Sequence, residues 1–282
     1  MKNDDFDYSY QYQNWHQDTE ESLNHDIESS IRFIKRHNLI SNEWGGKEDR
    51  ILEIGCGMGR FLLALRTLGF SNLTGVDIDK KQIEVAQKNN LEVYLDDAAK
   101  FLEEQNASFD YIYMLDILEH IEKEKQLPLL RMCYQKLSKS GVLALQVPNA
   151  LSPSFTYFRY DDFTHVTSYT EHSISFLLRN AGFEHFVHRP TGQESKNVRQ
   201  KKKYFAELLF AEFGIKRPIL TPNILTIAFK SEELKESWEK ATPPLVNDYG
   251  VKYESWELKR RLKKIIGKFL PAVLKEMIRK IR

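Results

Sequence analysis

The feature that most constrains the fold is one short stretch near the start of the chain. It reads Ile51-Leu52-Glu53-Ile54-Gly55-Cys56-Gly57-Met58-Gly59-Arg60-Phe61-Leu62: a short apolar strand, a glycine-rich turn and the beginning of a helix. Glycines at alternate positions carry no Cβ, so the backbone can approach a bulky ligand closely. The first N–H groups of the following helix then face that ligand. Because the Glu53 carboxylate would repel a phosphate, the turn favours a cationic or polyol ligand over a pyrophosphate.

A second strand follows at the distance that a βαβ unit requires. It covers residues 73–77 and ends in Asp77, 24 positions after Glu53. An acidic residue at this place accepts hydrogen bonds from a ribose diol. The G-x-G-x-G spacing differs from the G-x-G-x-x-G of dinucleotide binders and lacks the GK[ST] ending of a P-loop. The pattern therefore indicates a nucleoside site, and the alternative is a βαβ unit that holds no ligand.

Two motifs carry a resemblance to a known family. E-I-G-C-G-M-G-R together with G-V-D-I-D resembles the class I S-adenosylmethionine-dependent methyltransferases, and F-D-x-I-x-x-x-D-x-L-E-H-I over 109–121 resembles their fourth motif. The resemblance covers roughly residues 45–190. It implies S-adenosylmethionine as cofactor and a Rossmann-like α/β fold. In that fold, helices flank both faces of a seven-stranded, mostly parallel sheet whose strand 7 is antiparallel.

The same resemblance implies where the cofactor is held. Glu53 and the glycine turn would border its methionine and sugar portions, Asp77 its ribose, and the end of strand 4 its methionine. Asp97, followed by a small residue, would hold the adenine amino group, a role that can coexist with capping the next helix. The predicted cofactor-binding residues are Glu53, Gly55, Cys56, Gly57, Gly59, Asp77, Ile78, Asp97, Ala98, Leu115 and Asp116.

The acceptor side is predicted in the irregular segment 150–172, which follows the fifth strand at the sheet edge where α/β enzymes bind ligands. Its D-x-T-H-x-x-x-Y-T stretch resembles methyltransferases of bacterial surface-glycan gene sets. That resemblance implies O-methylation of a sugar or of a group on a lipid-linked glycan. The alternative acceptor is a quinone-type ring hydroxyl. A further alternative, from another class, is a non-catalytic binding subunit.

The predicted catalytic residues are His165, Asp162 and His120. An imidazole titrates near neutral pH and can take a hydroxyl proton, so His165 is the expected base and Asp162 would orient it. The alternative for His165 is a hydrogen-bonded loop histidine. His120 would share a helix face with Asp116 if a helix begins there, or it is a structural residue at the helix start.

No metal is expected. His165 and His172, with Asp161 or Asp162, are the residues that would hold one, but their seven-residue separation in a loop is not diagnostic.

Periodicity and turn signals predict the regular elements. Helices are expected over 18–37, 79–90, 127–137, 171–180 and 204–213, with another opening at 61–65, and a turn at 139–141. Strands are expected over 51–54, 73–77, 91–95, 109–116, 142–147, 183–188 and 224–229.

Composition limits the class of protein. The 282 residues are 41% hydrophobic and 29% charged, which suits one α/β domain with additions. Neither a run of 18 apolar residues nor a signal peptide is found, and two cysteines make no disulfide framework, so we expect a cytoplasmic protein. We expect no nucleic-acid substrate, because the body is acidic and lacks an N-P-P-[YF] motif.

Three regions are predicted: an aromatic arm and cap helix over 1–47, a methyltransferase core over 48–230 and a tail over 231–282. The cap helix either packs at the edge of the domain or forms a lid. The core contains an insert, 190–223, that suits an acceptor pocket or a homodimer contact. The tail is a charged connector followed by a basic amphipathic helix, where 256–282 carries ten Lys/Arg against two Glu. Its apolar stripe would lie on the inner membrane surface, on this body or on a twin subunit.

Overall fold

A computed structural model describes residues 20–40, 46–153, 155–191, 196–214 and 219–242. The chain divides into two compact units, the first made of 1–192 with 221–245 and the second of 193–220 with 246–282. Helix α9 (Lys196–Phe213) belongs to the second unit and contains the predicted helix 204–213. The aromatic arm over 1–19 and the amphipathic tail over 256–282 lie outside the described residues. None of the described helices is long and apolar enough to cross a membrane.

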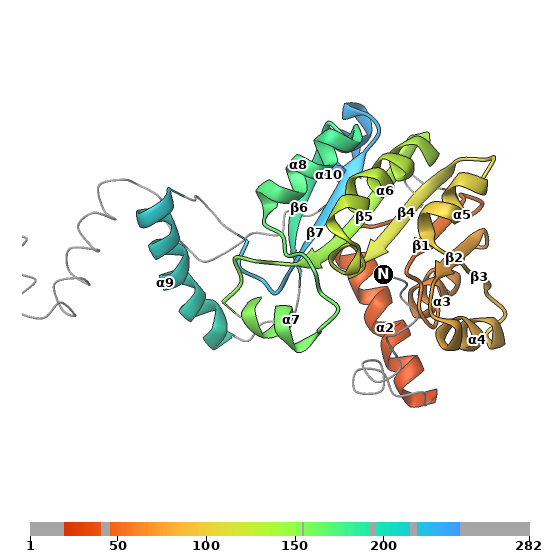
Figure 1. The fold of residues 1–282 in the computed structure, drawn as a ribbon, viewed down its shortest axis with the longest axis horizontal. Coiled ribbons are helices and arrows are strands. Elements are labelled where there is room, and N and C mark those ends of the chain that lie inside the picture. Colours follow the sequence, from red (N-terminus) through yellow and green to blue (C-terminus); the bar gives the residue numbers. More distant parts are fainter. Residues whose placement is uncertain (1–19, 41–45, 154, 192–195, 215–218, 243–282) are drawn as a thin grey trace, which may run out of the picture. The chain divides into compact units, whose positions relative to one another are not determined.

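The first unit is built on one seven-stranded sheet with the order β3-β2-β1-β4-β5-β7-β6 (Figure 1). β7 runs antiparallel to β5 and β6, and the other neighbours pair in parallel. This confirms the predicted fold class. The strands are β1 (Ile51–Ile54), β2 (Leu73–Asp77), β3 (Glu92–Leu95), β4 (Phe109–Leu115), β5 (Leu137–Pro148), β6 (His185–Thr191) and β7 (Asn223–Phe229).

Helices cover both faces of the sheet, because the central strands are apolar on both sides. One face carries α2 (Glu20–His37), α3 (Arg60–Thr67), α4 (Lys80–Lys88) and α10 (Glu232–Ala241). The other carries α5 (Ala98–Glu104), α6 (Lys123–Lys136) and α8 (Glu171–Ala181). Two short helices, η2 (Leu118–His120) and α7 (Phe155–Asp161), follow β4 and β5. Tyr113 of β4 and Trp238 of α10 lie in one continuous apolar core with α2 and α3.

The N-terminal helix α2 packs on the body. Ile34 is buried, and the Tyr113 hydroxyl donates a hydrogen bond to the Leu39 carbonyl just after the helix. An ion pair between Asp26 and Arg60 joins α2 to the first residue of α3, beside the glycine turn. The described part of the cap thus packs on the same face of the sheet as α3, and one of its contacts reaches the border of the predicted cofactor site. A role of the cap as a lid stays a prediction.

Three local predictions were wrong. Helix α6 begins at Lys123, so Pro128 lies within the helix, where its ring removes one backbone hydrogen bond. β5 begins at Leu137, which pairs with Phe109 across a register shift, so the predicted turn over 139–141 is part of the strand. The predicted connector contains α10, which Ser231 caps by accepting from the Leu234 N–H.

Candidate functional site

The glycine turn connects β1 to α3 and lies against the end of β2. Asp77 joins the two, because its Oδ2 accepts from the Gly57 N–H at 2.8 Å and its Oδ1 from the Asp79 N–H at 2.8 Å. Asp77 remains partly exposed at the last position of β2. The carboxylate that the sequence assigned to a ribose is thus held in place by backbone donors. The N-cap residue Gly59 gives α3 no side-chain cap.

The turn needs glycine because of close packing within the chain. Gly55 and Gly59 have φ of 71° and 76°, in the left-handed region. A Cβ on Gly55 would lie 2.0 Å from the Ile117 side chain, and one on Gly59 would lie 2.2 Å from the Leu91 side chain. We expected close approach of a ligand here. The structure shows close approach of the chain's own side chains, which shapes the turn that a ligand would meet.

Glu53 and Cys56 point into the protein. Glu53 is 5% exposed, and its Oε2 has no hydrogen-bond partner within the described part of the chain. Burial and then the neighbouring Asp77 raise the pKa of Glu53 well above its usual value. The Cys56 thiol is buried against Gly75. Cys56 therefore offers a ligand at the turn only its main-chain atoms.

The predicted adenine side contains one polar and one apolar group. Asp97 caps α5, since its Oδ1 accepts from the Ala99 and Lys100 N–H groups at 2.9 and 3.2 Å. The Ile78 side chain, directly after β2, is 57% exposed. A buried Glu53 oxygen without a partner, a fixed Asp77 carboxylate and an exposed apolar side chain fit a nucleoside that also carries hydrogen-bond donors.

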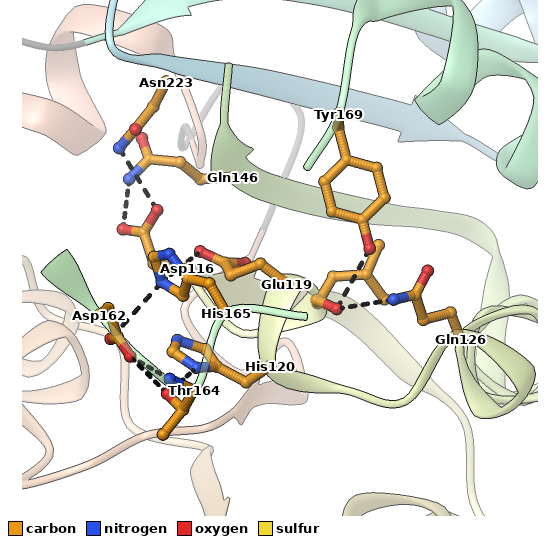
Figure 2. Close-up of polar contacts among 11 residues, drawn as sticks. Asp116, Glu119, His120, Gln126, Gln146, Asp162, Thr164, His165, Tyr169 and Asn223 are labelled. Carbon is orange, nitrogen blue, oxygen red and sulfur yellow. Dashed lines mark hydrogen bonds and ion pairs between the residues drawn. The ribbon is translucent and has the colours of Figure 1, made fainter. Parts of the chain in front are cut away.

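Beyond this turn, polar side chains gather where β4 and β5 end and the antiparallel β7 begins (Figure 2). Asp116 directly follows β4 with φ of 56°, a left-handed conformation that is uncommon outside glycine. Its carboxylate accepts from Gln146 Nε2 at 2.7 Å and from Asn223 Nδ2 at 3.3 Å. Gln146 and Asn223 were not among the predicted site residues. Gln146 near the end of β5 and Asn223 at the start of the antiparallel β7 lie at the same edge of the sheet, which is a signal that could have found them.

The segment after α7 is fastened onto η2 by main-chain and side-chain hydrogen bonds. The Glu119 carbonyl accepts from the Val166 N–H at 2.8 Å and from the Thr167 N–H at 3.3 Å. Gln126 Nε2 donates to the Ile121 carbonyl at 2.8 Å and to Thr167 Oγ1 at 3.1 Å. The Tyr169 hydroxyl donates to the Leu118 carbonyl (Figure 2). These bonds place His165 beside η2, although more than forty residues separate the two in sequence.

The three predicted catalytic residues meet here. His165 Nε2 lies 3.5 Å from Asp162 Oδ2. The rings of His120 and His165 meet edge to face with centroids 4.6 Å apart. His120 Nδ1 lies 2.7 Å from Thr164 Oγ1, whose hydroxyl donates to Asp162 Oδ1 at 2.6 Å. Burial and then His165 lower the pKa of His120 to about 4, so this imidazole is neutral at pH 7.

Two conditional expectations for this region do not hold. Because η2 is a three-residue 3₁₀ turn that follows a left-handed residue, Asp116 and His120 do not share an α-helical face. His172 is exposed at the start of α8 and lies outside the group of described residues close enough to share a cation. That group consists of Glu119, His120 and His165.

Glu119 is a site residue that the sequence analysis missed. Its side chain is fully buried, and neither carboxyl oxygen has a hydrogen-bond partner within the described residues. Oε1 lies 4.0 Å from His165 Nε2. Burial and then Asp116 raise the pKa of Glu119 well above its usual value. The E-H pair in the fourth motif was the available signal, but the motif alone did not show that His165 lies beside it.

Comparisons with known proteins agree with this architecture. Residues 23–187, more than half of the chain, match the methyltransferase domain family. The ubiquinone biosynthesis O-methyltransferase of Rickettsia typhi is 30% identical over 154 residues, which cover 51% of this chain and 58% of that protein. The 27-O-demethylrifamycin SV methyltransferase of Amycolatopsis mediterranei is 32% identical over 104 residues, covering 34% and 38% of the two chains. The chain thus spans roughly half, or less, of the length of these curated relatives.

A solved structure shares the fold. The S-adenosylmethionine-dependent methyltransferase from Archaeoglobus fulgidus superposes with a TM-score of 0.59 at 21% identity, covering 79% of this chain and all of that one. Strand order, the glycine turn with its Asp77 contact, and the family match lead to the same conclusion. The chain belongs to the methyltransferase domain family, and it has the fold of a class I S-adenosylmethionine-dependent methyltransferase.

Proposed function

We propose that the protein transfers a methyl group from S-adenosylmethionine to a hydroxyl on the ring of a small molecule of the quinone type. The observation that carries the proposal is the group of His165, Asp162 and His120 beside the end of β4, where two imidazoles and a carboxylate lie together. The names of relatives support an oxygen acceptor, since they include ubiquinone biosynthesis O-methyltransferases and a rifamycin O-methylating enzyme. They favour the quinone-type acceptor over the glycan acceptor, which rests on the loop pattern.

Each residue then has a stated task. When bound, the cofactor supplies an electrophilic methyl on a sulfonium. Asp77 accepts from the ribose hydroxyls, and the turn at Gly57 holds that carboxylate in place. His165 takes the proton of the acceptor hydroxyl as the new C–O bond forms, and Asp162, 3.5 Å from Nε2, stabilises the resulting imidazolium. Alignment of acceptor and methyl provides the rest of the rate acceleration.

The test is a split between turnover and cofactor binding. His165→Ala should lower kcat by about 10²–10⁴-fold, the usual contribution of a positioned base. The affinity for S-adenosylhomocysteine, measured by calorimetric titration, should stay within about twofold of wild type. Equal loss of turnover and affinity would show that His165 is structural.

The acceptor class is tested separately with two probes, a catechol and a sugar nucleotide. Methylation of the catechol and not of the sugar supports the proposed acceptor, and the reverse result supports the glycan acceptor. If wild-type protein binds no S-adenosylhomocysteine, the chain is a non-catalytic subunit and the proposal fails.

A further inference from the structure

Three potential metal ligands converge on one side of η2. Glu119 and His120 are the last two residues of that turn, and His165 reaches them from the segment fastened over it (Figure 2). One ligand atom from each lies within 4.8 Å of the other two. A point therefore exists within about 2.8 Å of all three, against about 2.1 Å for a zinc–nitrogen bond. Small side-chain rotations would bring the three atoms to bonding distance.

The burial of the Glu119 carboxyl group supplies the independent argument. Its side chain is completely buried and neither oxygen has a hydrogen-bond partner among the described residues. A buried carboxylate without a partner is costly, and buried charges in proteins are ordinarily paired or bound to metals. A cation between Glu119 and the two imidazoles would satisfy this buried carboxyl group.

The orientation of His120 supplies a further argument. Thr164 has a single hydroxyl hydrogen, which it donates to Asp162 Oδ1. Thr164 Oγ1 must therefore accept from His120, which puts the His120 proton on Nδ1. The lone pair is then on Nε2. A histidine that binds a metal through one nitrogen ordinarily donates its other N–H to a fixed oxygen in this way.

We propose that Glu119, His120 and His165 form a binding site for one divalent transition-metal cation of the zinc class. Two imidazole nitrogens and one carboxylate oxygen are borderline donors that suit Zn²⁺ or Co²⁺ better than Mg²⁺. Three protein ligands leave coordination positions open, as in catalytic zinc sites. This ligand set replaces the one considered from the sequence, which placed His172 with His165.

The role of the cation in methyl transfer rests on the proposed function, whereas its binding does not. A cation at this place would act as a Lewis acid and lower the pKa of the acceptor hydroxyl. His165 would then be a ligand, and Asp162, 3.5 Å from its Nε2, would be the carboxylate nearest to receive the proton. Without the cation, His165 keeps the role of base described above.

The experiment is calorimetric titration of the full chain, stripped of metals with a chelator, with Zn²⁺ alone, supported by the visible absorption spectrum of bound Co²⁺. Wild-type protein should bind about one ion per chain, and its Tm should rise with Zn²⁺ concentration. Glu119→Gln, which keeps the side-chain shape, and His120→Asn should each abolish this binding. Thr164→Val should weaken it by about 10–100-fold, as expected for the loss of a group that orients a ligand.

The matched control is His172→Asn, which removes the exposed histidine at the start of α8 and should leave Zn²⁺ affinity unchanged. Absence of stoichiometric Zn²⁺ binding by wild-type protein would overturn the inference, as would unchanged affinity in folded Glu119→Gln or His120→Asn. Should one of these two variants fail to fold, the other and the Co²⁺ spectrum of wild type decide the question. Titration with S-adenosylhomocysteine in the same buffers keeps the two proposals apart, because a protein that binds it without Zn²⁺ leaves the proposed function intact.

Discussion

Replacing Asp77 tests the cofactor site most directly. Its two oxygens each accept one backbone N–H, from Gly57 and from Asp79, both at 2.8 Å. Each oxygen keeps a lone pair for a ribose hydroxyl. A hydrogen bond to a charged group contributes about 1.5–3 kcal/mol. Two such bonds to the ribose amount to about 3–6 kcal/mol, so Asp77→Ala should raise the Kd for S-adenosylhomocysteine by about 10²–10⁴-fold.

Because Asp77 also anchors the turn, a loss of affinity alone would not identify the ribose as its partner. We therefore expect a double-mutant cycle to separate the two effects, with Asp77→Ala and a 2′-deoxy analogue of S-adenosylhomocysteine as the two changes. If the carboxylate holds the diol, the loss of binding free energy with both changes together should be much smaller than the sum of the two separate losses. Asp96→Asn, at the end of the neighbouring strand β3, is the control and should bind as wild type does. Strictly additive losses in folded protein would refute the reasoning.

Three further substitutions or conditions test the fold. Burial and nearby arginines, including Arg189, lower the pKa of His37 to about 3, so neutral His37 stabilises the fold fully above about pH 6.5 and this stabilisation is lost as pH falls toward 3. The free energy of unfolding in urea should fall by up to about 1.4 kcal/mol per pH unit in that window. This fall should be smaller in His37→Asn, and an equal dependence on pH in the variant would contradict the assignment. Gly55→Ala forces a side chain into a left-handed position against Ile117 and should cost at least about 1–2 kcal/mol, measured by the urea midpoint; an unchanged midpoint would be inconsistent with the turn described. Trp238→Ala should cost about 3–5 kcal/mol, because the indole is 2% exposed and donates to the Asn38 carbonyl, and a loss below 1 kcal/mol would argue against α10 as part of the core.

Much of the fold could be predicted from the sequence because its signals are local. β1 and β2 have the predicted bounds, and α4 lies within the predicted helix 79–90, with Asp79 as its cap accepting from the Lys81 and Gln82 N–H groups. The strand-turn-helix motif at Gly55 identified the fold, because few folds combine a glycine turn with a following strand that ends in an acidic residue. Helix α10 was missed because its segment is highly charged. Its Ser231 cap and its apolar stripe, centred on Trp238, were nevertheless readable.

The candidate site could be predicted only in part because it depends on contacts distant in sequence. Asp162 and His165 were named from the loop pattern, and their contact at 3.5 Å lies within that loop. Glu119 was not named, since its importance comes from burial and from His165, which no local pattern reveals. The same holds for the bond from Asn223 to Asp116, which joins the start of β7 to the residue after β4, two strands that β5 separates in the sheet.

The segment after α7 is attached in a way that tolerates changes of its exposed side chains. It is held by the Glu119 carbonyl, which receives the amide hydrogens of Val166 and Thr167. Main-chain groups are present whatever the amino acid, so mutations at the outward-facing Phe163 and Val166, 80% and 50% exposed, leave that attachment intact. Substitutions on this exposed surface can therefore accumulate while the histidine beside it keeps its place.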